Sequence, residues 1–457
     1  MNHTPVLVLG ALAAAAAGLW AWHRWHPVSY WFSVGYPFRA AWVCLTWPHV
    51  ASGCGLSHKR RRYRYTLDAL PVVGPAARTA ARSTSMVVEQ RRRLRRMEVD
   101  RPPRIRWMRP TRAGWKVSIK LTDGQIPEDY VKVAERLSHA WGVHAVRVLD
   151  WRPGRLTLVA VRRDPLTEVA ASPETGELLR VRPGVLENGR PWVMDFRVVP
   201  HWMNVGATMS GKSNLANAII AGLAPQPIAL VGFDLKGGVE FTPYKLRLSA
   251  LATTRAECVD LLDDLHAIVA DRMTLCRTRG VRNVWKLPDA LVPTPIVVLV
   301  DEVAELFLMA DKSEKDEVSK TATALLRLAQ LGRAFAIYLI VCGQRIGADL
   351  GPGVTALRSQ LSGRICHRVN DPETATMTLG DIDPDALAAA QKIAAETPGV
   401  AIVTGHDGTW HRARSVLTTE EQAEHAARTY AHLTPGWATL AGRRPAAAAD
   451  LPDTQAA

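Results

Sequence analysis

Cysteine and acidic residues are the scarce components of this chain. Its six cysteines are scattered and no two form a C-x-x-C pair; they are Cys44, Cys54, Cys258, Cys276, Cys342 and Cys366. This spacing argues against a disulfide framework and against a zinc site, so we expect six reduced, structural thiols. Lys and Arg (57) outnumber Asp and Glu (43), which leaves a formal net charge of +14. We therefore expect an anionic partner, either lipid headgroups or nucleic acid.

Long uncharged apolar runs are also scarce, and the clearest one opens the chain. Pro5–Trp22 is 18 residues without charge, just long enough to span a bilayer. Its aliphatic residues favour insertion by about 2 to 4 kcal/mol. No Lys or Arg precedes it, which argues against a cleaved signal peptide. A second apolar stretch, Ser29–Leu56, is interrupted by Pro37, Arg39 and Pro48, and it spans the membrane, lies in the interface or folds back as a hairpin.

A basic run follows these apolar segments. The excess of positive charge in "HKRRRYRY" at 58–65 marks the cytoplasmic side. We expect residues 1–57 to be a membrane anchor region, located in the cell membrane, with the rest of the chain on the cytoplasmic side. The tryptophans and tyrosines between residues 20 and 47 suit the headgroup region, although buried core aromatics would have the same pattern.

The positive charge is concentrated in two segments. Residues 59–64 carry +5 and residues 86–120 carry +9, which together equal the net charge of the chain. We interpret 58–110 as a basic linker, of which 91–110, rich in arginine and proline, is a linker or a frayed helix. Contact with an anionic partner and a merely solvated linker both remain open.

Residues 111–182 have the pattern of a small α/β module. "GWKVSIKL", "HAVRVL" and "RLTLVAV" alternate as strands should. Between the first two, Pro127 begins a helix with an apolar stripe, and Gly142 ends it. No catalytic constellation is visible, so a structural or docking role is expected.

Residues 183–415 carry the motifs of a nucleotide-driven motor. A hairpin around Asn188-Gly189 leads into a strand and then into G-x-x-x-x-G-K-S. Lys212 is expected to reach the β- and γ-phosphates of ATP, and the hydroxyl of Ser213 to hold Mg²⁺. The glycines let backbone amides face the phosphates. The predicted phosphate-binding residues are Gly206, Ala207, Thr208, Met209, Ser210, Gly211, Lys212 and Ser213.

An acidic pair follows a second strand. Ile296–Val300 is apolar throughout, which is typical of a strand buried on both faces of a parallel sheet. Asp301 is expected to bind Mg²⁺ through water, and Glu302 to polarise the attacking water. Helix capping is the alternative use of such a pair, and the upstream phosphate loop disfavours it.

Two further strands complete the predicted sheet. The strand in 334–345 ends on Gln344, which is expected beside the γ-phosphate, and the strand 228–233 is followed by Asp234 and Lys236. Apolar strands separated by helical stretches predict a parallel, doubly wound sheet with the ligand site beyond the carboxyl ends of its strands.

Five blocks in order resemble the FtsK/SpoIIIE family of DNA-pumping ATPases, most closely the transfer proteins of actinomycete conjugative elements (TraSA/TraB type). They are "NVGATMSGKSNLAN", "GFDLKGGVEFTPY", "PIVVLVDEVAELF", "LGRAFAIYLIVCGQR" and "SGRICHRVNDPETA", within 183–405. The resemblance implies a RecA-like P-loop motor that forms a homohexameric ring around double-stranded DNA and is tethered to the membrane by an N-terminal segment.

The resemblance also assigns residues. Lys212 and Ser213 match the phosphate-loop pair of the family, Asp301 and Glu302 its acidic motif, and Gln344 its sensor glutamine. In the family an arginine from a neighbouring subunit completes the ATP site, and Arg364 matches it best. Arg368 and Arg333 are rivals, and an arginine without that role is the remaining alternative for Arg364.

The chain departs from the family pattern in two places. Met209 stands where a glycine is common, which is expected to alter the packing of the loop and leave phosphate binding intact. No C-terminal winged helix is visible: residues 416–457 are predicted to form one helix, capped by Thr418 with Glu421, and a disordered tail. Sequence-specific loading on DNA is therefore expected to be missing or delegated to a partner.

The function predicted from these features is ATP-driven translocation of double-stranded DNA in conjugative transfer, by a membrane-anchored ATPase with other transfer proteins of the same element as partners. A chromosome-segregation motor shares the chemistry, but the short membrane region and the missing winged helix disfavour it. Export ATPases of the type VII kind usually carry several motor domains, whereas one phosphate loop is present here. A non-motor scaffold is disfavoured by the intact Lys212, Asp301 and Glu302.

Overall fold

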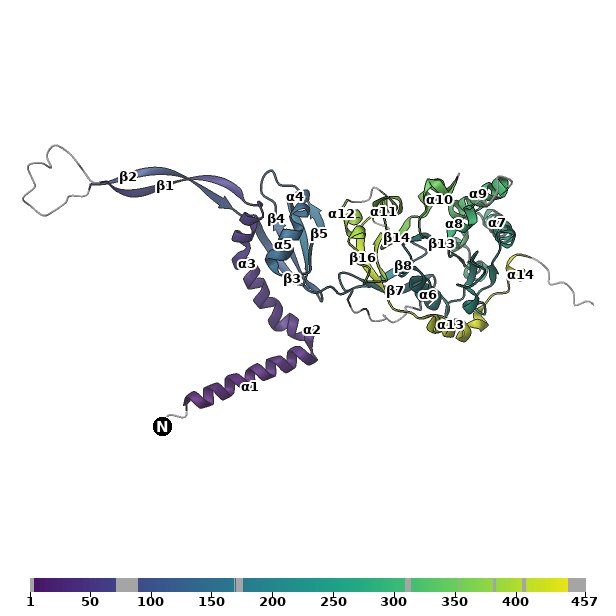
Figure 1. Ribbon diagram of the computed structural model, residues 1–457, viewed down its shortest axis with the longest axis horizontal. Helices are drawn as coiled ribbons and strands as arrows, with labels where there is room; N and C mark the ends of the chain where they lie inside the picture. The colour runs from purple at the N-terminus through teal and green to yellow at the C-terminus, as the bar shows by residue number, and fades with distance from the viewer. Residues whose placement is uncertain are drawn as a thin grey trace, which may run out of the picture. The chain divides into compact units, whose positions relative to one another are not determined.

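The structure is a computed structural model that divides into two compact units, Met1–Asp164 and Pro165–Ala457 (Figure 1). Each unit is described by itself. The described residues are 4–70, 89–167, 169, 176–308, 314–351, 353–380, 384–404 and 408–442, of which 4–12, 59–70 and 89–99 are described for the backbone alone. The sequence-based domain limits remain predictions.

The first unit is built on a four-stranded antiparallel sheet of order β3-β4-β6-β5. The turn between β5 and β6 uses Gly154 at φ 75°, and Gly142 ends helix α5 in the left-handed region, as predicted. The predicted single helix is broken at Val133 into α4 and α5. The elements are β3 (Arg104–Pro110), β4 (Gly114–Lys120), α4 (Pro127–Lys132), α5 (Ala134–Trp141), β5 (Ala145–Arg152) and β6 (Arg155–Val161).

The chain before this sheet is mostly helical. It forms α1 (Thr4–Trp25), α2 (Pro27–Tyr30), a π-helical turn (Trp31–Gly35) and α3 (Tyr36–Gly53). Val43, Trp47 and Ala51 on α3 are buried in one core with Trp115 and Trp141 of the sheet module. One face of the apolar stretch Ser29–Leu56 is therefore explained by packing onto the sheet, a use that the three membrane alternatives did not include.

Within the described residues no helix has both the length and the apolar character needed to cross a membrane. This part of the structure does not support the predicted transmembrane segment Pro5–Trp22. The side chains of residues 5–12, which belong to that prediction, lie outside the described residues.

The segment 91–110 is neither a linker nor a frayed helix. β1 (His58–Leu70) and β2 (Glu89–Arg101) form an antiparallel pair, in which His58 is opposite Arg101 and Leu70 opposite Glu89, and β3 follows directly. The prediction was wrong because strand pairing uses backbone hydrogen bonds, which a high content of charged side chains does not prevent.

The second unit contains a ten-stranded sheet of order β11-β10-β12-β13-β9-β14-β15-β16-β7-β8. The first six strands in this order are parallel, whereas β14 to β8 pair antiparallel. The prediction of a parallel sheet was thus right for the six strands from β11 to β14, and the whole sheet is mixed. The strands are β7 (Arg180–Leu186), β8 (Pro191–Asp195), β9 (His201–Val205), β10 (Ala229–Phe233), β11 (Ala250–Ala252), β12 (Ile296–Val300), β13 (Ile337–Gly343), β14 (Gly363–His367), β15 (Val400–Thr404) and β16 (Trp410–Ser415).

Helices cover this sheet on two sides. α6 (Lys212–Leu223) packs against α13 (Glu420–Thr429), whereas α9 (Lys315–Leu331) packs against both α7 (Arg255–Thr278) and α10 (Val354–Gln360). Right-handed crossovers, the usual hand, are expected to place these two groups on opposite faces. β10, β12 and β13 are buried along their whole length, as expected of strands covered on both faces. The remaining helices are α8 (Val303–Phe307), α11 (Pro372–Leu379), α12 (Pro384–Gln391) and α14 (Trp437–Leu440).

The hairpin and the C-terminal helix can be compared with their predictions. The hairpin around Asn188-Gly189 is confirmed: it joins β7 to β8, with Gly189 at φ 77°. Helix α13 is capped by Thr419 with Gln422, one residue later than predicted. The predicted tail lies outside the described residues from 443 onward.

Candidate nucleotide-binding site

The phosphate-binding loop lies between β9 and α6, as the sequence predicted. Helix α6 begins at Lys212, so the amides of its first turn have no helical acceptor and face the loop. The ammonium group of Lys212 is half-buried and donates to the carbonyl of Gly206. Burial lowers the pKa of Lys212, and the carboxylate of Glu302 opposes this effect. Ser213 is exposed at the start of the helix.

At two positions of this loop the backbone lies too close to neighbouring atoms for any side chain to fit. A Cβ on Gly206 would come 2.5 Å from Oγ of Ser210 and 2.6 Å from Cβ of His367. Gly211 has φ 105°, and a Cβ there would come 2.4 Å from the amide nitrogen of Gly399. Both glycines of the motif are therefore required by this packing.

Met209 is the second residue of this loop, besides Gly211, that has a positive φ. It has φ 61°, and its side chain is 88% exposed. A residue with a Cβ is strained in this conformation, so the glycine expected from the family pattern would fit better. The exposed side chain leaves the phosphate-facing backbone uncovered.

Segments far along the chain hold the loop in place. The amide of Gly206 donates to the carbonyl of Gly343 on β13 (3.3 Å). The amide of Ala207 donates to the carbonyl of Arg368 (2.8 Å), and the carbonyl of Ser210 accepts from the amide of Gly399 (2.9 Å).

The acidic pair lies at the carboxyl end of β12. Asp301 forms an ion pair with Lys236, in which Nζ is 2.7 Å from Oδ2. Glu302 is buried, and its Oε1 accepts a hydrogen bond from the amide of Gln344 (3.3 Å). Its Oε2 is buried without a hydrogen-bond partner. Burial raises the pKa of Glu302, against the opposing charge of Lys212.

The topology brings these groups together. β13 lies between β9 and β12 in the sheet, so its end meets the phosphate loop on one side and the acidic pair on the other. Gln344 follows β13 directly, and its side chain is exposed. The structure thus brings three predicted features to the same edge of the sheet: the phosphate loop, the acidic pair and Gln344.

Asp234, which the sequence placed at a strand end without a role, organises the neighbouring loop. It is fully buried, and its Oδ2 accepts from the amides of Glu240 (2.8 Å) and Phe241 (3.1 Å). Its Oδ1 accepts from the amide of Lys236 (3.2 Å), so the same carboxylate positions the lysine that pairs with Asp301.

His367 is a residue of this site that sequence reasoning missed. It is fully buried on β14 against Gly206, and its Nδ1 is 3.2 Å from the carbonyl of Val400. No local pattern marks it, because its role depends on the pairing of β14 with β9.

The three candidate arginines lie in different surroundings. Arg364, on β14, is half-buried, and its guanidinium donates to the carbonyls of Thr378 (2.8 Å) and Arg358 (3.4 Å). Arg368 donates to the carbonyl of Thr208 (3.2 Å), which places it on the phosphate loop of its own chain. Arg333 is exposed after α9.

The residues present fit a nucleotide and Mg²⁺. Ser210 Oγ and Glu302 Oε2 are buried without partners, which is the state expected of groups that serve a ligand. The carboxylate of Asp301 already holds a cation, the ammonium of Lys236. Carboxylate and hydroxyl oxygens, here on Asp301 and Ser213, are the ligands that Mg²⁺ prefers.

Fold and site together define a P-loop ATPase. The FtsK/SpoIIIE family pattern matches residues 158–348, and the pattern of the actinomycete conjugal transfer protein N-terminal domain matches residues 19–162. The chain is 40% identical to the transfer protein TraSA of Streptomyces ambofaciens over 89% of this chain and 95% of that protein.

Two more distant similarities agree with this result. A DNA translocase FtsK from Chlorobaculum tepidum is 29% identical over 39% of this chain and 23% of that protein. The fold is similar to the monomer form of the pCW3 conjugation coupling protein TcpA, solved with ATPγS, with a TM-score of 0.52 and 18% identity over 72% of this chain and 94% of that chain. The chain belongs to the actinomycete conjugal transfer proteins of the FtsK/SpoIIIE family and is an ATPase.

Proposed function

We propose that this protein is an ATP-driven translocase of double-stranded DNA that acts in conjugative transfer. The observation that carries the proposal is the convergence of Lys212, Asp301, Glu302 and Gln344 at the end of the parallel strands. The transfer protein that is 40% identical over nearly its whole length supports conjugation over chromosome segregation or protein export.

Each residue has a proposed role in hydrolysis. Lys212 and the amides of the loop 206–213 bind and neutralise the β- and γ-phosphate oxygens. Glu302 holds the attacking water and accepts its proton, since Oε2 is buried without another partner. Gln344 couples the end of β13 to Glu302 through its amide. Asp301 and Ser213 would hold Mg²⁺, which when bound supplies the charge that stabilises the leaving phosphate.

We propose further that the active assembly is a homohexamer in which Arg364 completes the site of a neighbouring subunit. Its guanidinium must then leave the carbonyl of Thr378. Complementation in trans tests this assignment: Arg364→Ala and Lys212→Ala subunits, inactive alone, should regain hydrolysis when mixed. The same mixing with Arg368→Ala or Arg333→Ala shows whether one of these residues acts instead.

Attachment to the cell membrane, with the motor on the cytoplasmic side, is a further part of the proposal. The uncharged run Pro5–Trp22 and the basic run at 58–65 support it from the sequence. Alkaline carbonate extraction of cell membranes tests it: recovery of the chain in the soluble fraction would contradict stable insertion.

ATP turnover with and without linear duplex DNA tests the translocase. We expect DNA to stimulate turnover, and Lys212→Ala and Glu302→Gln each to lower it by about 10²- to 10⁴-fold. Lys245→Ala and Glu305→Gln are matched controls, because both residues lie in the same unit outside the site. Displacement of a triplex strand from the duplex then separates translocation from binding. Turnover indifferent to DNA would contradict the proposal.

A further inference from the structure

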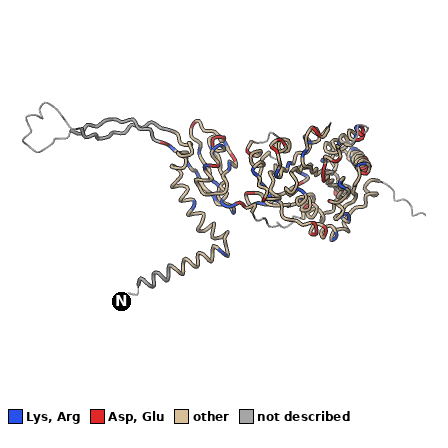
Figure 2. Tube along the Cα trace, viewed as in Figure 1, with Lys and Arg blue, Asp and Glu red and all other residues tan. Residues whose placement is uncertain are grey.

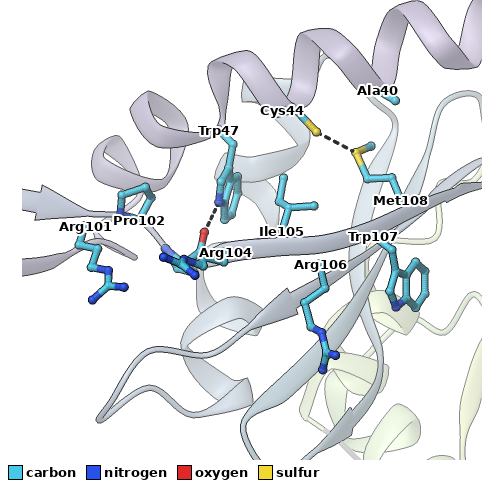
Figure 3. Close-up of a pocket in the computed structure, with 11 residues that line it drawn as sticks. Ala40, Cys44, Trp47, Arg101, Pro102, Arg104, Ile105, Arg106, Trp107 and Met108 are labelled. Atoms are coloured by element: carbon cyan, nitrogen blue, oxygen red, sulfur yellow. Dashed lines mark hydrogen bonds between the residues drawn. The ribbon is translucent and has the colours of Figure 1, made fainter.

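Figure 3 shows α3 beside the segment 101–108, with Ile105 and Met108 pointing toward the helix and Arg106 pointing away from it. The groove between the two, in the first unit, is lined by apolar side chains and by arginines. It has a volume of about 660 Å³, within the range of small-molecule sites. Ala40, Cys44 and Trp47 of α3 form one wall, at the helical spacing i, i+4, i+7. The opposite wall consists of residues 101–108, in which Met108 lies 3.8 Å from Cys44 by their sulfur atoms.

The outer face of α3, next to this groove, is apolar and exposed. Phe38 and Leu45 are 77% and 81% exposed, and Ala41 and Pro48 on the same stripe are also exposed. The helix carries one charged residue, Arg39, and no acidic one (Figure 2). The guanidinium of Arg39 lies over the rings of Trp42 and Trp115, at 5.0 and 5.6 Å, and so does not reduce the apolar character of the stripe.

The segment 101–109 carries a row of four arginines, of which three line the groove. The fourth, Arg109, lies over the ring of Trp107, 5.0 Å from its centroid. Arg101, Arg104, Arg106 and Arg109 are all exposed. A β-bulge between Ile105 and Trp107 interrupts the alternation of β3, and both Arg106 and Trp107 are exposed.

Acidic residues that could neutralise this row are scarce. The first acidic residue of the chain is Asp68. Asp100, the one next to the row in sequence, accepts a hydrogen bond from Ser52 at 2.5 Å. The row therefore offers several positive charges to one anionic ligand.

We propose that this groove binds an anionic phospholipid, with its phosphate on Arg104 and Arg106 and an acyl chain along Ala40, Cys44 and the outer stripe of α3. An apolar chain joined to an anionic group matches the apolar residues of α3 and the exposed arginines beside them. A second copy of the chain would place the same arginine row against itself, and duplex DNA has no counterpart for the apolar stripe. The inference adds a lipid class to the proposed membrane attachment, and it is independent of the ATP site.

Flotation of the full chain with vesicles of phosphatidylcholine, with and without phosphatidylglycerol, tests the proposal. Wild type should bind the anionic vesicles at least tenfold more tightly. Arg104→Gln with Arg106→Gln should remove this preference, a loss of about 30-fold, at roughly fivefold per arginine at an anionic surface. Arg152→Gln with Arg155→Gln, in the β5–β6 turn of the same sheet, is the matched control and should retain it.

The apolar wall is tested in the same assay. Phe38→Ser with Leu45→Ser should weaken binding to both kinds of vesicle, whereas Leu149→Ser, an exposed leucine of β5, should not. A retained anionic preference in the arginine variant overturns the proposal. Two other results for the arginine variant also overturn the proposal. A changed oligomeric state with unchanged flotation would identify a subunit interface. A loss of duplex binding alone would identify a DNA contact. DNA-stimulated ATP turnover should be unchanged in all these variants, so failure here is distinct from failure of the translocase proposal.

Discussion

The ammonium of Lys236 lies 2.7 Å from Oδ2 of Asp301, the carboxylate that we propose as a ligand of Mg²⁺. Both residues follow buried parallel strands, β10 and β12, that are hydrogen-bonded neighbours in the sheet. The lysine side chain is 43% exposed, so the ion pair is partly screened and contributes at most about 1 kcal/mol. At the proposed metal site, Lys236 is therefore expected to compete with a metal ion for Asp301 without excluding it.

Replacing Lys236 by methionine removes this competition while keeping the aliphatic stem. We expect the nucleotide-free protein to bind Mn²⁺, used as a spectroscopic substitute for Mg²⁺, about three- to fivefold more tightly. Titration followed by electron paramagnetic resonance measures it. Lys245→Met, at an exposed lysine of the same segment, should leave the affinity unchanged. Weaker Mn²⁺ binding in Lys236→Met would mean that the lysine supports the metal site.

Met209→Gly should stabilise the second unit. The methionine has φ 61° and an exposed side chain, so glycine removes strain of about 1 kcal/mol and little buried surface is lost. Thr208→Gly, at the neighbouring exposed residue without a positive φ, should lower the free energy of unfolding by about 0.5 to 1 kcal/mol. Urea unfolding measures both. A loss of stability in Met209→Gly as large as that in Thr208→Gly would show that the loop is not strained.

The second unit should lose stability as the pH falls below neutral. Burial lowers the pKa of both His201 and His367 from 6.5 to about 4. Between these values the unfolded chain binds protons that the folded chain excludes, so stability is complete above about pH 6.5 and declines toward pH 4, by at most about 1.4 kcal/mol per pH unit for each histidine.

His367→Gln should reduce this pH dependence by one proton, as measured by urea unfolding at several pH values. His425→Gln, at an exposed histidine of α13, is the control and should behave as wild type. An unchanged slope in His367→Gln would contradict the burial of a neutral imidazole beside the phosphate loop.

Trp47→Ala should destabilise the first unit strongly. The indole is 3% exposed, lies 5.9 Å from the ring of Trp141 and donates to the carbonyl of Pro103 at 2.6 Å. Its removal should cost about 3 to 5 kcal/mol. Trp25→Ala, at an indole that is 73% exposed, should cost less than about 0.5 kcal/mol. Unfolding of the full chain in mild detergent measures both, and equal effects would show that α3 does not pack on the sheet in solution.

The parts of the site that sequence reasoning found are those encoded by adjacent residues. A glycine-rich loop before Lys212, and an acidic pair directly after five apolar residues, are local patterns with a physical meaning. They predict the central parallel strands as well, since buried strands are apolar throughout.

The parts that it missed depend on long-range pairing. β14 is parallel to β9 but antiparallel to β15. No local sequence pattern in 363–404 predicts this change of strand direction. An apolar stretch such as Ser29–Leu56 has the same composition whether it packs on lipid or on a protein core, so its contact with Trp115 and Trp141 had no separate signal.

The phosphate loop is held by residues that lie far beyond it in the sequence. The amide of Ala207 and the carbonyl of Ser210 take their partners from Arg368 and Gly399, which leave the ribosome more than a hundred residues later. During synthesis the loop therefore emerges long before the groups that hold it. The nascent chain can complete the hydrogen bonds of this loop only after residue 399 has emerged, so the loop folds together with the later strands and not ahead of them.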